Sequence, residues 1–220
     1  MTEIDVEKWN RKNQYKNFIN YSNPVFSIGT TLEVTKLVSF CREGGLSFFS
    51  SFLYFVTISV NEISELNLRI KGDKVVWYEK THPGYVVLCD NQELRTCITK
   101  TDDDFYRFYK ATRDDISSTR FKDEVTAYNE TVNLESFYVS NLPWITFTSV
   151  SNPYDLNDKE QTAIPRITWG KYYERGKKYI VDFNISAHHA LVDGAQASRM
   201  ICCLQDKLDS LKITEDTNER

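Results

Sequence analysis

Two adjacent histidines, His188 and His189, are the residues of this sequence whose type and spacing best suit proton transfer. An imidazole can gain or lose a proton near neutral pH, which is what a general base requires. The pair lies in the segment ISAHHALVDGAQ (185–196), where Asp193 follows the second histidine by four residues. The preceding residues alternate like a strand, and alternation places the two histidines on opposite faces. At most one of them points into a given site, and a polar corner at a strand end is the structural alternative.

Asp193 can support such a base in two ways. Its carboxylate can contact the imidazole, or it can pair with a cation that braces the turn. Gly194 then permits a tight turn and a close approach of the backbone. Motifs of other chemistries are missing, since the sequence has no HExxH, Walker A loop, dinucleotide-binding glycine fingerprint or GxSxG elbow. A cysteine nucleophile that pairs with His189 stays open, although no local cysteine-protease signature is present.

The composition is that of a soluble globular protein. Of 220 residues, 41% are hydrophobic and 26% are charged, enough for one domain with a large core. The net charge of −4 and the lack of a basic stripe argue against nucleic acid as a partner. The N-terminus has no hydrophobic signal core, and serines and threonines interrupt the apolar run 48–60. We therefore expect a cytoplasmic protein without a membrane span.

Two further groups of residues invite a metal or redox interpretation. The five cysteines are odd in number and lack CxxC spacing, so buried free thiols are predicted rather than disulfides or a zinc site. Asp102, Asp103 and Asp104 suit the N-terminus of a helix, where acids meet the positive end of the dipole. A metal site at these aspartates is the lesser alternative, and no metal is expected.

The pattern of apolar residues predicts helices mixed with many strands. Helices are predicted over 35–45, 46–62, 101–116 and from Asp193 onward. Strands are predicted over 25–34, 67–79, 84–90, 135–150, 163–174 and 177–187, with turns at Gly72 and Gly176. Residues 112–134 are predicted to be a loop or an irregular helix. The predicted class is α+β, a mixed β-sheet with helices packed on one side, in a single domain over 1–220 with a polar tail from about 214.

Four segments together resemble the chloramphenicol acetyltransferase family. They are KWNRKNQY (8–15), SNLPWITF (140–147), IPRITWGKYY (164–173) and HHALVDG (188–194), in the order and near the spacing of that family. The resemblance covers roughly residues 8–210. The HxxxDG motif alone is shared with other coenzyme A-dependent acyltransferases, whereas the four segments are more specific.

The resemblance implies an acetyl-CoA-dependent O-acetyltransferase. His189 would be the general base that deprotonates the acceptor hydroxyl, which then attacks the thioester directly. Asp193 would form a buried ion pair with Arg11, Ser140 would donate a hydrogen bond to the oxyanion, and Thr168 would hold a water. Ordinary structural roles are the alternative for Arg11, Ser140 and Thr168.

The resemblance also implies binding residues and an assembly. Trp144, Lys171 and Tyr172 match positions near coenzyme A, which would be a co-substrate rather than a permanently bound cofactor. Phe18, Phe26 and Tyr138 match positions of the acceptor pocket. The family forms homotrimers with active sites at subunit interfaces. The sequence departs from the family pattern around the acceptor, at Asn17, Pro24, Ala195 and Gln196.

The most direct interpretation is a chloramphenicol O-acetyltransferase that inactivates the antibiotic. A relative that acetylates another hydroxylated acceptor is the nearest alternative. The catalytic domain of a dihydrolipoamide acyltransferase is a further enzyme alternative, although no lipoyl domain or linker is seen upstream. A non-catalytic protein that binds coenzyme A or a hydrophobic ligand is the alternative from another class, and a purely structural trimer is the weakest.

Overall fold

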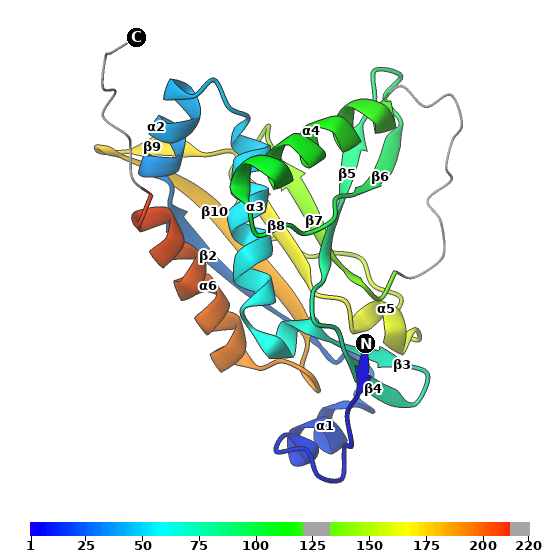
Figure 1. The fold of residues 1–220 in the computed structure, drawn as a ribbon. Coiled ribbons are helices and arrows are strands. Elements are labelled where there is room, and N and C mark those ends of the chain that lie inside the picture. The colour runs from blue at the N-terminus through cyan, green and yellow to red at the C-terminus, as the bar shows by residue number, and fades with distance from the viewer. Residues whose placement is uncertain (121–132, 212–220) are drawn as a thin grey trace.

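The computed structural model describes residues 1–120 and 133–211. In chain order the elements are β1 (Thr2–Glu3), α1 (Lys12–Phe18), β2 (Val25–Glu33), α2 (Thr35–Glu43), α3 (Phe48–Asn61), the 3-10 helix η1 (Ser64–Asn67), β3 (Leu68–Lys71), β4 (Lys74–Trp77), β5 (His82–Leu88), β6 (Leu94–Ile98), α4 (Phe105–Arg120), β7 (Ser136–Leu142), α5 (Lys159–Thr162), β8 (Arg166–Gly170), β9 (Tyr173–Arg175), β10 (Lys178–His188) and α6 (Gly194–Asp209). Figure 1 shows how they are arranged in space.

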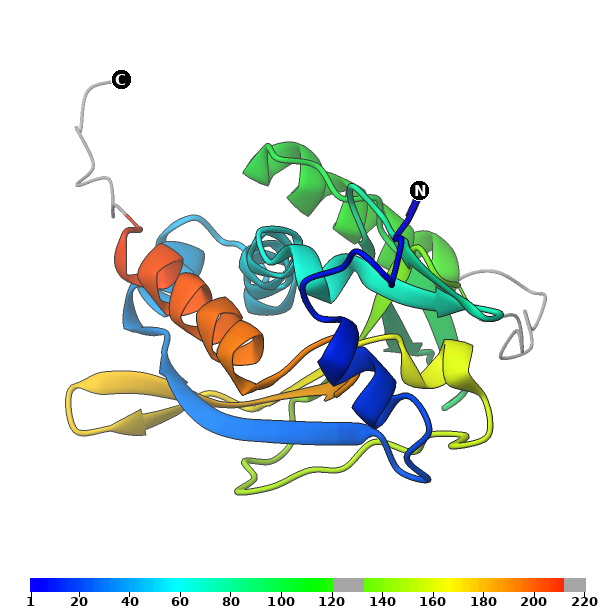
Figure 2. The ribbon, with the colours of Figure 1, turned by 90° about the horizontal axis from the view of Figure 1, so that it is seen from below.

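The predicted class is confirmed, because the large sheet is mixed and its long helices cover one face. Its strand order is β2-β10-β8-β7-β5-β6, and β9 pairs with β10 outside this path. β7 lies parallel to both β8 and β5, whereas the other pairs are antiparallel. Figure 2 shows α2, α3, α4 and α6 on one side of this sheet. A small second sheet has the order β1-β4-β3.

Helix α3 lies at the centre of the helical layer, which explains its sequence. It contacts α2, α4 and α6, so almost its whole circumference faces other elements. Phe52, Leu53, Val56 and Val60 are fully buried. The ring of Phe52 meets Trp169 of the sheet edge-on, with 5.0 Å between ring centroids. The nearly continuous apolar pattern of 46–62 therefore reflects a helix covered on most sides.

The other face of the sheet is crossed by residues 143–158, here called the covering segment, which pass below the sheet in Figure 2. The predicted strand over 135–150 is wrong beyond Leu142, because Pro143 lacks an N–H for the ladder and Ile145 N turns back to Leu142 O. The backbone N–H of Phe147 donates to Asp182 on β10 at 2.9 Å. A row of polar residues on this face of β10 is buried, namely Asp182, Asn184, Ser186 and His188.

Several boundaries differ from the sequence prediction for local reasons. Helix α4 begins at Phe105 rather than Thr101, because the side chain of Asp104 accepts from the N–H of Arg107 and caps the helix. It continues to Arg120, so residues 112–120 are regular helix rather than the predicted loop or irregular helix. Residues 121–132 of that prediction and the polar tail from 214 lie outside the described residues. Neither α1 nor β6 was predicted, since α1 is short and polar and β6 has only five residues. The turns at Gly72 and Gly176 are confirmed, with φ of 57° and 65°.

All five cysteines are free thiols as predicted, but only three of the five are buried. Cys41, Cys89 and Cys97 are buried, whereas Cys202 is exposed and Cys203 is partly exposed. The reason is helical geometry, because the buried stripe of α6 contains Ala197, Met200, Leu204 and Leu208 and leaves position 202 on the outer face. Within the described residues, no helix is long and apolar enough to cross a membrane.

Replacing Gly170 with alanine should show that the covering segment is packed tightly on the sheet. A Cβ at this position would lie 2.9 Å from the carbonyl oxygen of Ile145, so the backbone of the segment must move. We expect a loss of about 1–3 kcal/mol in the free energy of unfolding, measured by denaturant titration. Gly194→Ala is the matched control, because a Cβ there meets nothing within 4 Å. Equal stability of the two variants would contradict this packing.

Candidate active site

The turn that carries the histidine motif is held by backbone hydrogen bonds and buried apolar side chains. β10 ends at His188, whose carbonyl accepts from the N–H groups of Leu191 and Val192 at 3.0 Å each. Ala190, Leu191 and Val192 are buried in the protein interior. The apolar residues between the histidines and the acid therefore anchor the turn, which fixes where both ends of the motif lie.

His188 has a structural environment. Its side chain is only 1% exposed, and its Nδ1 accepts a hydrogen bond from the N–H of Ala190 at 3.1 Å. Burial, with a smaller contribution from the charge of Lys159, lowers the pKa of His188 to about 4. The imidazole is thus neutral at physiological pH and serves as an internal hydrogen-bond acceptor, which agrees with the structural interpretation of this residue.

His189 lies between two aromatic side chains. Its ring stacks on Phe18 with 4.0 Å between centroids and an interplanar angle of 3°, and Phe26 lies 4.8 Å away. Its backbone N–H donates to the carbonyl of Pro24 at 2.8 Å. α1 and β2 therefore hold the imidazole in a fixed orientation. Two of the three residues predicted to bind the acceptor, Phe18 and Phe26, are in direct contact with the predicted base.

Asp193 braces the turn through a cation, which is the second of the two roles open to it. Its Oδ2 accepts from Nη1 of Arg11 at 2.9 Å, and the two side chains are 28% and 10% exposed. Burial by itself would raise the pKa of Asp193, but the hydrogen bonds from Arg11 and from the N–H of Ala195 outweigh it and lower the pKa. The ion pair predicted between Arg11 and Asp193 is therefore present in the fold.

Asp193 also caps helix α6. Its Oδ1 accepts from the N–H of Ala195 at 2.9 Å, while Oε1 of Gln196 accepts from the N–H of Asp193 at 2.9 Å. This reciprocal arrangement is a capping box, and the sequence signal Asp-x-x-Gln was available to find it. Gln196 is buried by this role. Its departure from the family pattern thus has a local structural reason at the start of α6.

Gly194 is not required by the backbone of this turn, contrary to the expectation from its type. It is the first residue of α6, and an added Cβ would meet no atom within 4 Å. Its φ also lies outside the left-handed region, since only Gly45, Gly72 and Gly176 among the described glycines have positive φ. The space beside this glycine is therefore open in a single chain.

Helix α1, which sequence reasoning missed, contacts both ends of the motif. Arg11 precedes its first residue and reaches Asp193, while Phe18 is its last residue and stacks on His189. The seven residues of α1 thus span the turn from the acid to the base. Its only two aromatic residues, Tyr15 and Phe18, are too few to show a helical period, which is why the sequence alone did not indicate it.

Ser140 and Thr168 are neighbours in the sheet. They are directly paired on the parallel strands β7 and β8, so their side chains share the face crossed by the covering segment. Ser140 is half-buried, whereas Thr168 is buried and its Oγ1 accepts from Nδ2 of Asn152 at 3.4 Å. Asn152 was not among the predicted residues, because its proximity to Thr168 depends on the path of the covering segment.

The predicted binding residues lie at opposite ends of this strand pair. Tyr138 precedes Ser140 by two residues, at the start of the strands, whereas Trp144, Lys171 and Tyr172 follow the ends of β7 and β8. The N–H of Lys171 donates to the carbonyl of Ile145, next to Trp144, at 2.8 Å. Trp144 and Lys171 are exposed, and Tyr172 is half-buried against Phe48.

One chain does not bring the two halves of the predicted site together. Thr168 pairs with Asn184 on β10, five residues before His189. Two strand spacings and this offset put Ser140 roughly 19 Å from His189 within one chain. Tyr138 is likewise three strands from β2, which carries Phe26. The base with its aromatic neighbours and the pair of hydroxyls therefore form two separate groups.

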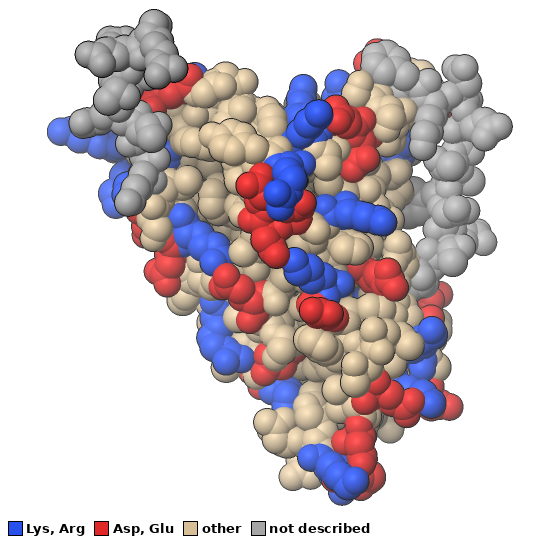
Figure 3. Space-filling view, viewed as in Figure 1, with Lys and Arg blue, Asp and Glu red and all other residues tan. Residues whose placement is uncertain are grey.

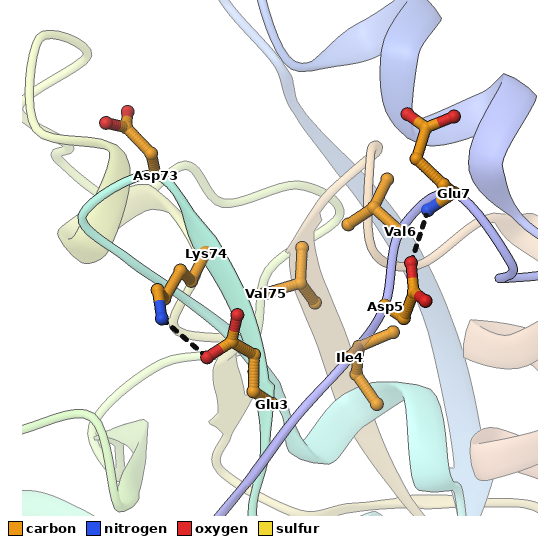
Figure 4. Close-up of a pocket in the computed structure, with 8 residues that line it drawn as sticks. All are labelled: Glu3, Ile4, Asp5, Val6, Glu7, Asp73, Lys74 and Val75. Atoms are coloured by element: carbon orange, nitrogen blue, oxygen red, sulfur yellow. Dashed lines mark hydrogen bonds and ion pairs between the residues drawn. The ribbon is translucent and has the colours of Figure 1, made fainter.

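Two surface hollows lie near the N-terminal segment rather than at either group. One of about 480 Å³ is lined by Glu3–Glu7 and Asp73–Val75, and Figure 4 shows Lys74 paired with Glu3 at its edge. The other, of about 250 Å³, is lined by residues that include Trp9, Arg11 and Trp77. Neither includes His189, Ser140 or Thr168.

Two of the aspartates considered as a metal site form ion pairs with basic side chains. On the face shown in Figure 3, acidic and basic side chains are interspersed. Asp102 accepts two hydrogen bonds from Arg107, which lower its pKa to about 2, and Asp103 pairs with Lys80 at 2.6 Å. No group of three histidine, cysteine or acidic residues suited to a metal was found among residues 1–120 and 133–211.

The mixed sheet, its one-sided helical layer and the histidine turn at the end of β10 form a fold shared with solved acetyltransferases. A solved chloramphenicol acetyltransferase superimposes with a TM-score of 0.85 at 27% identity, covering 93% of this chain and 98% of the other. The dihydrolipoamide acetyltransferase of Azotobacter vinelandii gives 0.66 at 18% identity, covering 90% of this chain and 86% of the other, which shows a shared fold alone.

Sequence comparison identifies the family within this group of folds. The family model described as chloramphenicol acetyltransferase matches residues 1–205. The chloramphenicol acetyltransferase of Proteus mirabilis is 27% identical over 208 residues, 94% of each chain. That of Clostridium perfringens is 29% identical over 203 residues, 89% of each chain. The protein belongs to the chloramphenicol acetyltransferase family.

Asp193→Asn should destabilise the fold at neutral pH, because it leaves the guanidinium of Arg11 buried without its carboxylate. Since the Asp193 side chain is partly exposed, we expect a loss of about 1–3 kcal/mol, below the range for a fully buried pair. The pKa of Asp193 is lowered from 3.8 in the folded state, so the contribution is present above pH 4 and disappears as the pH falls through the lowered value. Denaturant titrations at pH 7 and pH 3 should show the two proteins converging in acid.

Glu3→Gln is the matched control for this variant. The pair between Glu3 and Lys74 is 2.6 Å long, but both side chains are more than half exposed. We expect a change within about 0.5 kcal/mol at either pH. A similar loss in both variants would show that burial of the Arg11–Asp193 pair is not what makes it stabilising.

Proposed function

We propose that this protein is an acetyl-CoA-dependent O-acetyltransferase whose acceptor is chloramphenicol, and that it inactivates the antibiotic. The observation that carries the proposal is the imidazole of His189, held between Phe18 and Phe26 at the end of β10 in a chain of this family. The relatives that it matches over most of their length are named for the same reaction. Two aromatic faces around a base suit an acceptor with a flat ring.

In the proposed mechanism, His189 removes the proton of the acceptor hydroxyl as the oxygen attacks the thioester carbonyl of acetyl-CoA. The protonated imidazole then returns the proton to the departing thiolate, so no acyl-enzyme forms. Ser140 donates a hydrogen bond to the oxyanion of the tetrahedral intermediate, and Thr168 holds a water beside it. Asp193 and Arg11 act through the turn, by fixing the position of the imidazole.

Acetyl-CoA is proposed to enter from the end of β7 and β8 that carries Trp144, Lys171 and Tyr172. The positive charge of Lys171 suits a phosphate, and the exposed indole of Trp144 offers apolar surface to the coenzyme. The acceptor enters from the other end, beside Tyr138. Acetyl-CoA is a co-substrate in this proposal, and no permanently bound cofactor or metal takes part.

The active enzyme is proposed to be a homotrimer, with each site formed by two copies of the chain. The separation of roughly 19 Å between Ser140 and His189 within one chain supports this, because both side chains must contact the same tetrahedral intermediate. The 68% exposure of Trp144 and the open space beside Gly194 leave room for a neighbour. We also propose that residues 1–220 form a single cytoplasmic acetyltransferase domain.

His189→Ala should abolish transfer without unfolding the protein. Chloramphenicol and acetyl-CoA are mixed with the enzyme, and free coenzyme A is followed with a thiol reagent. We expect the rate of the variant to be roughly 100- to 10,000-fold lower, because the base is lost. The circular dichroism spectrum should be unchanged. If coenzyme A release is equally slow in the wild type, the acceptor is another hydroxylated molecule and not chloramphenicol. Substantial activity in His189→Ala would refute the mechanism.

Mixing two inactive variants tests whether the site is shared between chains. His189→Ala and Ser140→Ala are each expected to lose activity, the latter by roughly a hundredfold or more. When they are unfolded and refolded together, random trimers regain an intact site at about a quarter of their interfaces, because one chain supplies His189 and its neighbour supplies Ser140. Activity no higher than the sum of the separate variants would show that each site lies within one chain.

A further inference from the structure

A second row of side chains lies beside Ser140 and Thr168 on the same face of the sheet. Tyr138 pairs with Arg166, just as Ser140 pairs with Thr168, and Arg166 also pairs with Ser186 on β10. Because side chains two residues apart share a face, Arg166 is about 7 Å along β8 from Thr168, on the side of the proposed acceptor entrance. A cation is thus placed next to the proposed reacting centre, at a position that the sequence analysis did not select.

Arg166 joins β8 to the covering segment. Its Nη1 donates to the carbonyl oxygen of Pro153, and its Nη2 donates to Oε1 of Gln161 at 3.3 Å. The guanidinium carbon lies 3.8 Å from the centre of the Tyr154 ring and 5.9 Å from that of Tyr138. Burial raises the pKa of Tyr154 to about 12, so the guanidinium rests on a neutral phenol ring. Hydrogen bonding and stacking together require the planar group of arginine.

Arg166 binds Pro153, and the residue before it, Asn152, contacts Thr168. Asn152 donates to Oγ1 of Thr168 at 3.4 Å, and Pro153 and Tyr154 follow it directly. The position of Asn152 over Thr168 therefore depends on where Arg166 fixes the next two residues. A guanidinium and the rings of Tyr138 and Tyr154, all half-buried, form one polar and aromatic wall at this end of the strand pair.

We propose that Arg166 is a positioning residue that determines acceptor specificity, by fixing residues 152–154 of the covering segment as one wall of the acceptor site. The inference rests on the proposed function for the location of that site. Such a wall suits a hydroxylated acceptor that carries a planar polar group, such as an amide or a nitro-substituted ring, because flat groups stack on guanidinium and phenol faces. The end of the site that receives acetyl-CoA is unaffected by Arg166.

Kinetics of Arg166→Leu and Arg166→Lys test the effect on the acceptor. We expect the leucine variant to raise the KM for chloramphenicol roughly tenfold or more while the KM for acetyl-CoA stays within about twofold. The KM for chloramphenicol of the lysine variant should lie between those of the wild type and the leucine variant, because lysine keeps the charge but loses the planar group. An equal rise in both KM values, or a fall in kcat alone, would contradict a specific role on the acceptor side.

Amide hydrogen exchange of the same variants tests the positioning without any turnover. Peptides that cover residues 150–158 should exchange faster in Arg166→Leu than in the wild type, since the contacts to Pro153, Gln161 and Tyr154 are lost. Arg175→Leu is the matched control, because Arg175 also lies over a tyrosine ring, at 5.7 Å from Tyr173, in the hairpin of β9 and β10. It should change neither the exchange of these peptides nor the KM for chloramphenicol.

The two measurements separate failure of this inference from failure of the proposed function. If the wild type does not acetylate chloramphenicol, the proposed acceptor is wrong, and hydrogen exchange alone decides whether Arg166 holds the segment. Unchanged exchange in Arg166→Leu overturns the inference whatever the activity. Faster exchange with an unchanged KM for chloramphenicol overturns the role in specificity.

Discussion

The ion pair between Arg11 and Asp193 is the interaction on which the rest of the candidate site depends. It joins residues that are 182 positions apart, and it ties the N-terminal segment to the start of α6. Arg11 immediately precedes α1, so fixing Arg11 also fixes the helix whose last residue stacks on His189. A charge as deeply buried as Arg11 requires its carboxylate, which makes this docking of α1 specific rather than merely favourable.

The division of the site into two groups follows from the topology of the sheet. The base, His189, follows the end of β10 beside Phe26 of β2 and Phe18 of α1, while β7 and β8 carry the hydroxyls in the middle of the sheet. Hydrogen-bonded strands are rigid at their pairing distance, so no side-chain rotation can bridge the gap. Under the proposed mechanism each chain therefore supplies two half-sites, and the proposed assembly of copies is the physical means by which they meet.

The covering segment has a different role from the helices on the opposite face. The helices bury the apolar face of the sheet, whereas residues 143–158 satisfy polar groups on the other face, including Asp182 and Thr168. Buried polar groups of this kind require partners in defined positions. A segment without helix or strand can supply them because its backbone and side-chain groups are not used in regular structure. This is why an irregular segment can shape a binding site with some precision.

The predicted strands and helices that proved right are those with a clear local pattern. The alternation before His188 indicated β10, the apolar run from Phe48 indicated α3, and the stripe after Asp193 indicated α6. Short or polar elements lacked such a pattern, which is why α1 and β6 were missed and the strand after Leu142 was predicted too long. Local propensity in these segments is weak, and contacts with distant residues decide their conformation.

The motif residues, the α+β class and the membership of a family could be predicted from the sequence, because these depend on residue types and their order along the chain. The sequence also indicated Arg11 and Asp193 as a pair, through resemblance. Which side chains contact one another could be seen only in the folded protein. The stacking of Phe18 on His189, the contact of Asn152 with Thr168 and the place of Arg166 beside Tyr138 all depend on strand register and on the path of loops. Contacts between residues far apart in sequence leave no local signal in the sequence. They are determined by the packing of the whole fold, to which many distant residues contribute.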